Sequence, residues 1–526
     1  MNTSKFNIYI YIYILIIITI GYQLTYAISN HWDIIAADEI SYLKFGKNLF
    51  SEVRFDWGFL YNLWYKFLSL FAPSTIDLYY LNYKVLIIGL PILLLICLVV
   101  YGIQPFIAFV ISYLFLLSKL HITTWPFVSD FCICLLLLCF ILLKFIKEQG
   151  WQYMVLTFFF FLLYLTRPEF IIAFAPAAII AFIKNKRHKY RWIYLLLMVS
   201  AIVFIGSRGT ELKGIDRGFL AYAQHYLVTY IVWNKPVNFT AYDYFELAPK
   251  IFGKSFTLMG SIIHNPLEAL RHITTCTGFY ILNMTKAVED FLLPSFLFQK
   301  IGKIKHLVFL TLMLIAIRML VKEKNKFTFN NVKNTLGIGA ILFILATSIP
   351  NFLIGYSTHY LQLHFVILLL GISLILFKNK SYQISWAAQT ICCIIFFIFT
   401  PSIKNYNFPT VDYKETKNLP IQKLAAFINK NNDHQPHFLI SFQTNLHFIF
   451  DGSNFTSSDV FSIDKPFFEY IEKHKVNYIY INEQLLNDAK LSKDVQWKEF
   501  YSNPEKYNFY KQKINGTTNY LLIRKT

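Results

Sequence analysis

Residues 8–28 read IYIYIYILIIITIGYQLTYAI, an apolar run long enough to cross a bilayer as a single helix. A hydrocarbon core about 30 Å thick needs about 20 apolar helical residues for each crossing. The run is too long for the core of a signal peptide, and no small-residue cleavage site is evident. We therefore expect a retained signal anchor and a protein that is embedded in a membrane.

The composition of the whole chain agrees with this expectation. Its 526 residues are 56% hydrophobic and only 15% charged, and the mean hydropathy is +0.45, far too apolar for a soluble protein of this length. The net charge of +19 does not indicate a nucleic-acid partner, because the lysines and arginines cluster in short tracts between apolar runs, as in polytopic proteins. The seven cysteines show neither a metal-binding spacing nor a disulfide framework.

Apolar runs of crossing length recur along the first 400 residues. The expected fold class is therefore mostly α, a polytopic membrane helix bundle of about eleven transmembrane helices. The candidate spans lie near residues 8–28, 80–101, 103–119, 127–146, 151–166, 170–184, 191–207, 302–321, 334–354, 360–377 and 382–400.

Basic tracts between these spans predict which side of the membrane each loop faces. If the N-terminus is cytoplasmic, every such tract falls on the cytoplasmic side, as the positive-inside rule requires. The outer side then holds 29–79, 208–301 and everything after residue 400. The bias toward Lys, Asn, Ile and Phe suggests an AT-rich bacterial genome, so we expect an integral protein of the bacterial inner (cell) membrane. The basic tracts are Lys144 with Lys147, KNKRHKYR (184–191), KEKNK (322–326) with Lys333, and KNK (378–380).

The outer segments are not plain loops. Residues 218–233 and 265–294 carry apolar residues at helical spacing, which suits helices lying on the membrane surface. After Pro401 the composition turns polar, so we expect a transmembrane domain over 1–400 and a small extracytoplasmic α/β domain over 401–526. The latter's expected elements are strands over 436–442 and 476–482, helices over 419–430 and 464–475, and a hairpin at Asn515-Gly516.

An acidic pair opens the amphipathic stretch AADEISYLKFGKNLF (36–50), just outside the first span. Asp38, Tyr42, Phe45 and Leu49 share one helical face, so Asp38 is expected to point toward the packed side, with Glu39 offset by about 100°. Adjacent carboxylates on a helix do not easily chelate one ion, so different roles are more natural. The simplest alternative is that both merely interact with the positive end of the helix dipole.

Two further polar turns are expected on the same side. LTRPEF (165–170) places Arg167 and Glu169 between two spans, and GYSTHYLQLHF (355–365) brings His359 and Tyr360 to the start of another. A guanidinium is well suited to holding a phosphate, although an arginine at this boundary also snorkels for purely structural reasons. Single histidines at such a boundary are more often interface residues than ligands.

The order of these elements resembles the GT-C superfamily of polytopic glycosyltransferases, which includes protein O-mannosyltransferases and lipid A aminoarabinose transferases. The resemblance implies that Asp38 is the catalytic carboxylate, Glu39 its neighbour in the acceptor or metal site, and Arg167 a contact of the donor phosphate. His359 and Tyr360 stand where many relatives have Arg-Tyr, which implies a second phosphate contact. The supporting residues that it implies are Glu169 and Tyr42.

By the same resemblance, the substrate is a sugar linked through phosphate to a polyprenyl lipid, and the acceptor is a hydroxyl of a glycan, lipid or protein. A divalent cation, Mg or Mn, held by Asp38 or Glu39 is a further implication. The chain has no Gly-rich nucleotide-binding loop, which agrees with a donor carried by membrane lipids.

Two other classes of protein remain open from the sequence. A transporter or flippase of lipid-linked saccharides also has many spans, but such proteins place ionisable residues at the bilayer midplane and often show repeated halves. A polysaccharide polymerase or ligase has a large outer loop that depends on basic residues. The basic residues in the second outer region are Arg208, Arg217 and Arg271.

Overall fold

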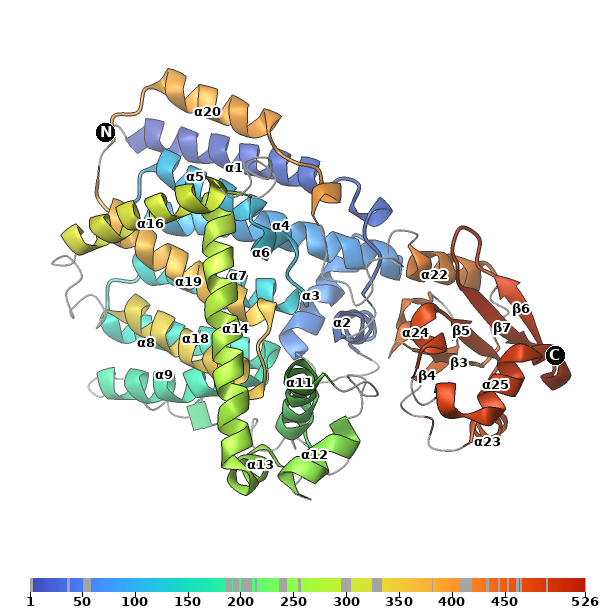
Figure 1. The fold of residues 1–526 in the computed structure, drawn as a ribbon. Helices are drawn as coiled ribbons and strands as arrows, with labels where there is room; N and C mark the ends of the chain where they lie inside the picture. Colours follow the sequence, from blue (N-terminus) through green and yellow to red (C-terminus); the bar gives the residue numbers. More distant parts are fainter. Residues whose placement is uncertain are drawn as a thin grey trace.

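The computed structural model shows a bundle of apolar helices joined to a small β-sheet domain at the C-terminus (Figure 1). The sheet lies beyond one end of the bundle, and most of the long helices run toward it. The structure describes residues 3–35, 38–50, 58–185, 192, 198–199, 211–212, 215–235, 244–253, 257–294, 304–323, 334–380, 382–406, 419–431, 435–442, 445–451, 454–459, 463, 466–488 and 491–525.

Five helices are long and apolar enough to cross a membrane, which indicates an integral membrane protein. The short α-helices and 3-10 turns between them pack at their ends. The five are α1 (Thr3–Thr25), which leads into η1 (Ile28–Asn30), then α4 (Thr75–Val100), α7 (Val128–Phe145), α18 (Thr335–Ile349) with its π-helical extension η5 (Pro350–Ile354), and α19 (Thr358–Phe377).

The other predicted spans are helical where the structure describes them, but these helices are shorter or less apolar than the five. The predicted span 191–207 lies outside the described residues except for 192, 198 and 199. Eleven crossings therefore stay a prediction, whereas a membrane helix bundle is confirmed. The further apolar helices are α5 (Pro105–Leu117), α8 (Gln149–Thr166), α9 (Ile171–Lys184), α16 (Ile304–Glu323) and α20 (Trp386–Ile398).

Short helices pack where the long ones begin and end. In the hairpin of α2 (Asp38–Lys47) and α3 (Phe59–Leu68), a methyl group on Gly46 would lie 2.4 Å from Tyr65 Cβ, so only glycine allows this approach. The remaining short helices of the bundle are α6 (Lys119–Ile122) and the single turns η2 (Pro168–Phe170) and η6 (Ile403–Asn405).

The two ends of the bundle gather different residues. At the end next to the sheet, Glu39 of α2 contacts the Phe127 backbone at the start of α7, and Arg167 after α8 contacts Tyr360 at the start of α19. These contacts bring together the segments that the basic-tract argument assigned to one side of the membrane.

The opposite end gathers the helix termini that carry basic residues. There the Asn379 N–H donates to Gly102 O at 3.0 Å, and Asn185 Nδ2 donates to Gly150 O at 3.0 Å. Lys184 lies in the last turn of α9 beside this contact. The polar cluster around Arg167 and these lysine-bearing ends are thus at opposite ends of the helices.

The region between α9 and α16 is largely helical, as the sequence predicted over 218–233 and 265–294. The long helix α14 crosses the bundle at a steep angle to α18 and α19 (Figure 1), and Tyr280 Oη lies 2.9 Å from His364 Nδ1. Its position at a membrane surface stays a prediction. The elements here are the short ladder of β1 (Glu211–Leu212) and β2 (Ile215–Asp216), then α11 (Arg217–Asn234), α12 (Tyr244–Phe252), α13 (Leu258–His264) and α14 (Pro266–Leu292).

The C-terminal residues form a five-stranded sheet of order β4-β3-β5-β7-β6. Strand β3 pairs in parallel with β4 and β5, whereas β7 pairs antiparallel with β5 and β6. The strands are β3 (His437–Ser441), β4 (Phe455–Asp459), β5 (Tyr478–Ile481), β6 (Phe509–Lys513) and β7 (Tyr520–Arg524). The helices and helical turns are α22 (Pro420–Lys430), η7 (Leu446–Ile449), α23 (Phe467–Lys473), α24 (Glu483–Leu486), η9 (Leu491–Lys493), α25 (Val495–Ser502) and η10 (Pro504–Tyr507).

The sequence predicted most of this domain correctly. The two apolar strands, the helices over 419–430 and 464–475 and the hairpin at Asn515-Gly516 are confirmed, and Gly516 has the positive φ of +73° that the turn requires. Strand β4 was not predicted, because FTSSD is polar and lies at the edge of the sheet, where alternating burial is weak.

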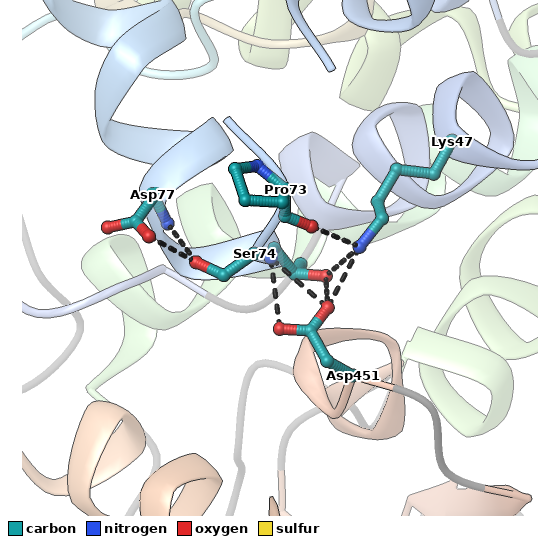
Figure 2. A network of polar contacts seen from close by, with 6 residues as sticks. Lys47, Pro73, Ser74, Asp77 and Asp451 are labelled. Atoms are coloured by element: carbon teal, nitrogen blue, oxygen red, sulfur yellow. Dashed lines mark hydrogen bonds and ion pairs between the residues drawn. The ribbon is translucent and has the colours of Figure 1, made fainter. Parts of the chain in front are cut away.

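Two carboxylates fasten the sheet domain to the bundle. Figure 2 shows Asp451, which precedes β4, accepting a hydrogen bond from Lys47 Nζ at 2.8 Å. Asp451 also accepts from Thr75 N at 3.1 Å, at the start of α4. Asp33 accepts from the backbone N–H of Ile421 at 2.7 Å, and so meets the positive end of α22. Each carboxylate lies in one part of the protein and caps a helix of the other.

We expect Asp451→Ala to loosen this junction by about 1–2 kcal/mol, since a charge-assisted cap is lost at a half-exposed position. Hydrogen exchange of the intact protein in detergent should then rise in η7 and α22. Glu499→Ala is the matched control, because it breaks an exposed ion pair to Lys506 within the sheet domain itself. Equal exchange in the two variants would contradict a fastening role for Asp451.

Candidate functional site

The carboxyl group of Glu39 is fully buried and surrounded by hydrogen-bond donors. Its Oε1 accepts from the hydroxyls of Tyr61 and Tyr65, each at 2.6 Å, and Oε2 accepts from Phe127 N at 2.9 Å. Asn82 Nδ2 lies 3.4 Å from the same Oε1 and donates to both phenols, at 2.7 and 2.8 Å. We call these residues the Glu39 cage.

Burial and hydrogen bonding act on Glu39 in opposite directions. Burial raises the pKa of the carboxyl group to about 7, although the donors of Tyr61, Tyr65 and Phe127 lower it. The hydrogen-bond donors of the cage favour the ionised form and offset part of the effect of burial, but the pKa stays above that of an ordinary glutamate.

The structure corrects the expected orientation of the acidic pair. Asp38 is exposed at the first residue of α2, whereas Glu39 is the buried member. The prediction assumed one packed face, but α2 packs on two sides. Glu39 and Gly46 face α3, while Ser41 accepts a hydrogen bond from Asn445 of the sheet domain at 3.0 Å.

Arg167 forms a second polar cluster at the end of α8. Its Nε lies 2.6 Å from Glu169 Oε1, Nη1 donates to Ser129 Oγ at 3.0 Å, and Nη2 donates to Tyr360 Oη at 2.5 Å. Tyr360 in turn donates to Glu169 Oε1 at 3.1 Å. The structure thus brings together three of the predicted site residues, Arg167, Glu169 and Tyr360.

The backbone explains why Arg167 points into this cluster. Pro168 disfavours helical geometry for the residue before it, and Arg167 accordingly has φ −145° and ψ 125°. Burial lowers the pKa of Arg167, but Glu169, Tyr360 and other neighbouring groups together outweigh it and the net shift is upward. The guanidinium is therefore a fixed positive charge, and Glu169 balances it.

His359 lies at the rim of the Arg167 cluster but does not add a positive charge. Its Nδ1 is 2.6 Å from Ser357 Oγ, and its Nε2 faces Arg167 Nη2 at 3.5 Å. Since Arg167 Nη2 is only a donor, Nε2 must be the acceptor and the proton must be on Nδ1. The imidazole in this geometry is neutral, so it lacks the positive charge of the arginine that many members of the superfamily that the sequence resembles have here.

Tyr42 connects the two clusters. An added methyl on Gly58, which has φ +64°, would lie 2.8 Å from both the Tyr42 ring and Thr166 O, so α2 and the end of α8 approach closely here. The Tyr42 ring also packs edge-on against Tyr61, with centroids 5.3 Å apart. Asp38 begins the helix one turn before Tyr42, about 6 Å along its axis.

The start of α7 makes a second connection. Phe127 donates its N–H to Glu39, and Ser129, two residues later, accepts from Arg167. The next residue, Asp130, accepts from Gln362 Nε2 of α19 at 2.7 Å, and both side chains are buried. This bond fixes α19 against α7, and with it the position of Tyr360.

Several of these residues were not predicted from the sequence. Asn82 and Asp130 are polar residues inside apolar runs, and that position was the signal for them, because such residues are costly there unless partnered. Tyr61 and Tyr65 gave no such signal, since tyrosines are common throughout the chain.

The acidic pair does not have the geometry of a metal site. Glu39 faces the cage, where its oxygens accept the hydrogen bonds given above, while Asp38 is exposed. Among the residues that the structure describes, no three His, Cys, Asp or Glu side chains gather so as to hold a metal ion. The Mg or Mn ion that the resemblance implied stays a prediction.

One of the basic residues considered for a polymerase or ligase, Arg271, lies in the packing between α11 and α14. Arg208 lies outside the described residues, and Arg217 begins α11. Arg271 lies over the Trp233 ring at 4.1 Å and pairs with Glu268 at 3.4 Å, contacts that belong to the packing of α11 on α14.

No protein-family model matches the chain, and no curated protein is significantly similar to it. The functional assignment therefore depends on the geometry of these residues.

The raised pKa of Glu39 predicts a specific pH dependence of stability. In the folded protein Glu39 stays protonated up to about pH 7, whereas an unfolded glutamate stays protonated only up to about pH 4.5. The contribution of Glu39 to the free energy of unfolding therefore falls as the pH rises between these two values. Between pH 4.5 and about 7, we expect the unfolding free energy of wild type to fall by up to about 3 kcal/mol relative to that of Glu39→Gln.

Unfolding of both proteins in detergent between pH 4.5 and 8 measures this difference. Burial raises the pKa of Asp33 to about 7 as well, but Asp33 is present in both proteins and cancels in the comparison. Parallel curves for wild type and variant would show that Glu39 does not titrate in this range.

Proposed function

We propose that the protein is a membrane glycosyltransferase, which moves a sugar from a polyprenyl-phosphate donor to a hydroxyl group of a glycan, lipid or protein. One observation carries the proposal: the Arg167 cluster and the carboxylate-bearing helix α2 adjoin at one end of an apolar bundle. A lipid-linked sugar presents its phosphate at such a boundary, while the prenyl chain remains among the apolar helices. The full proposal places eleven crossings in a bacterial inner membrane, with this end facing outward.

Arg167 is proposed to bind the donor phosphate. Its guanidinium is held by Ser129 and Tyr360, which limits the entropy lost when a ligand binds. Glu169 Oε1 lies 2.6 Å from the guanidinium Nε, so a phosphate that binds to Nε has to displace this carboxylate. The displaced Glu169 carboxylate then lies beside the bound phosphate, and the two negative charges repel each other. This repulsion ends when the polyprenyl phosphate leaves the site.

Asp38 is proposed to be the general base. In the transfer, Asp38 takes the proton of the acceptor hydroxyl while that oxygen forms a bond to the anomeric carbon of the sugar. The bond between this carbon and the phosphate oxygen breaks, and its electron pair leaves with the polyprenyl phosphate. The positive charge of Arg167 stabilises the leaving phosphate, and orientation of the two substrates supplies the remainder.

Glu39 is proposed to be a positioning residue. Its carboxylate fastens α2 to α3 and α7 through the cage, and this fixes the start of α2 where Asp38 lies. The two adjacent carboxylates thus have different roles, as expected from their separation of about 100° around the helix.

We expect Asp38→Asn to fold normally but to lower transfer by about a hundredfold or more, because the amide cannot accept the proton. Protein in nanodiscs, supplied with polyprenyl-phosphate sugars and a hydroxyl acceptor, is assayed for release of polyprenyl phosphate. Asp77→Asn is the matched control, since Asp77 is also an exposed carboxylate in the first turn of a helix near the junction. Near-normal turnover by Asp38→Asn would exclude Asp38 as the base.

Arg167→Lys keeps the charge but loses the planar set of donors, so we expect transfer to fall by about tenfold or more. Arg271→Lys serves as the control for a stacked arginine outside the site. If folded wild-type protein releases no lipid phosphate from any donor, the enzymatic proposal fails and transport of lipid-linked saccharides becomes the better interpretation.

A further inference from the structure

The hairpin of β6 and β7 borders an open pocket of about 520 Å³ at the edge of the C-terminal sheet. In Figure 1 this edge lies on the side of the sheet away from the helical bundle. The lining residues are Lys511 and Lys513 of β6, Thr517 and Thr518 of the turn, and Tyr520 of β7.

The turn that forms one wall is firmly held. Asn519 Nδ2 donates to the buried hydroxyl of Tyr480 on β5 at 2.7 Å, which ties the turn to the core of the sheet. Lys423 of α22 donates to Gly516 O at 2.8 Å from the other side. One wall of the pocket is therefore formed by a segment with a fixed conformation.

The pocket is positively charged and has an aromatic wall. Lys511 Nζ lies 3.6 Å from the centroid of the Tyr520 ring, and the Tyr520 hydroxyl is 2.8 Å from that of Tyr501. Within the part of the chain that the structure describes, neither Lys511 nor Lys513 pairs with a carboxylate. Two ammonium groups, the exposed Thr518 and a tyrosine ring thus line one space, whereas the buried Thr517 hydroxyl bonds to the backbone of the turn.

Lysines on an edge strand also have a simpler explanation. They prevent the edge from pairing with another chain, and charge alone is sufficient for that purpose. A protective role does not require a recess of this size, a tied turn or a lysine lying over a ring. These features are better explained by a ligand that fills the space.

We propose that this pocket binds an acidic saccharide, a short chain of sugars that carries carboxylate or phosphate groups. The lysines supply charge-assisted donors for the acidic groups, while the Thr518 hydroxyl and the Tyr520 ring suit sugar hydroxyls and ring faces. The volume is within the range of small-molecule sites and is larger than a single inorganic ion needs. A role in holding the acceptor rests on the proposed transfer reaction, whereas the binding itself does not.

Calorimetric titration of the full-length protein in phosphatidylcholine nanodiscs tests the proposal. The probes are tetragalacturonate, which is acidic, maltotetraose, which is neutral and of similar length, and inorganic phosphate. We expect tetragalacturonate to bind, the other two to bind at least about tenfold more weakly, and Lys511→Gln/Lys513→Gln to weaken tetragalacturonate binding by about tenfold or more.

Lys473→Gln/Lys498→Gln is the matched control, because it removes the same charge from exposed positions of the same domain. If both double variants weaken tetragalacturonate binding equally, the binding reflects general charge attraction, and the proposal is overturned. Absence of tetragalacturonate binding, or equal affinity for phosphate, would also overturn it. Loss of binding in nanodiscs with phosphatidylglycerol would assign the lysines to lipid headgroups instead. No donor is needed, so the result is independent of whether the protein transfers sugar.

Discussion

The arrangement at the sheet end of the bundle depends on a carboxylate that is entirely removed from water. Glu39 accepts hydrogen bonds from two phenols of α3 and from the backbone at the start of α7. An ionised group in such surroundings is tolerated only if its partners are in place, because an unpartnered buried charge costs several kcal/mol. The requirement therefore acts as a constraint on three helices at once. It fixes the position of the start of α2 relative to α3 and to the N-terminal end of α7.

The second cluster depends on the same helices from the other side. Ser129, two residues after Phe127, holds the Arg167 guanidinium, and Gln362 binds Asp130 so that Tyr360 reaches the same arginine. Residues far apart in the chain thus meet because Phe127, Ser129 and Asp130, which contact them, are close neighbours at the start of α7. Below the surface, the apolar packing of α4, α7 and α19 supplies rigidity, whereas the polar contacts determine which side chains meet.

The sequence was sufficient for the parts that follow from composition and length. The long apolar runs became helices, and the β-branched and aromatic runs at 436–442 and 476–482 became strands, because both signals reflect burial of a continuous apolar surface. The orientation of Asp38 and Glu39 was not predictable, since α2 packs against α3 on one side and against the sheet domain on the other. Periodicity identifies one buried face, but it cannot show that a second partner, about 400 residues later, covers the opposite face. The polar partners of Glu39 depend on that tertiary arrangement as well.

The internal pair of Arg167 and Glu169 has a consequence for discrimination among anions. Any anion that reaches the guanidinium has to compete with a carboxylate that is already 2.6 Å from Nε. Chloride, a sphere without directional acceptors, gains little from such an exchange and pays for its own dehydration. A tetrahedral oxyanion has several oxygens, which can replace the glutamate and also accept from the remaining N–H groups. If Arg167 binds the phosphate as proposed, the internal carboxylate thus favours a tetrahedral oxyanion over a halide ion.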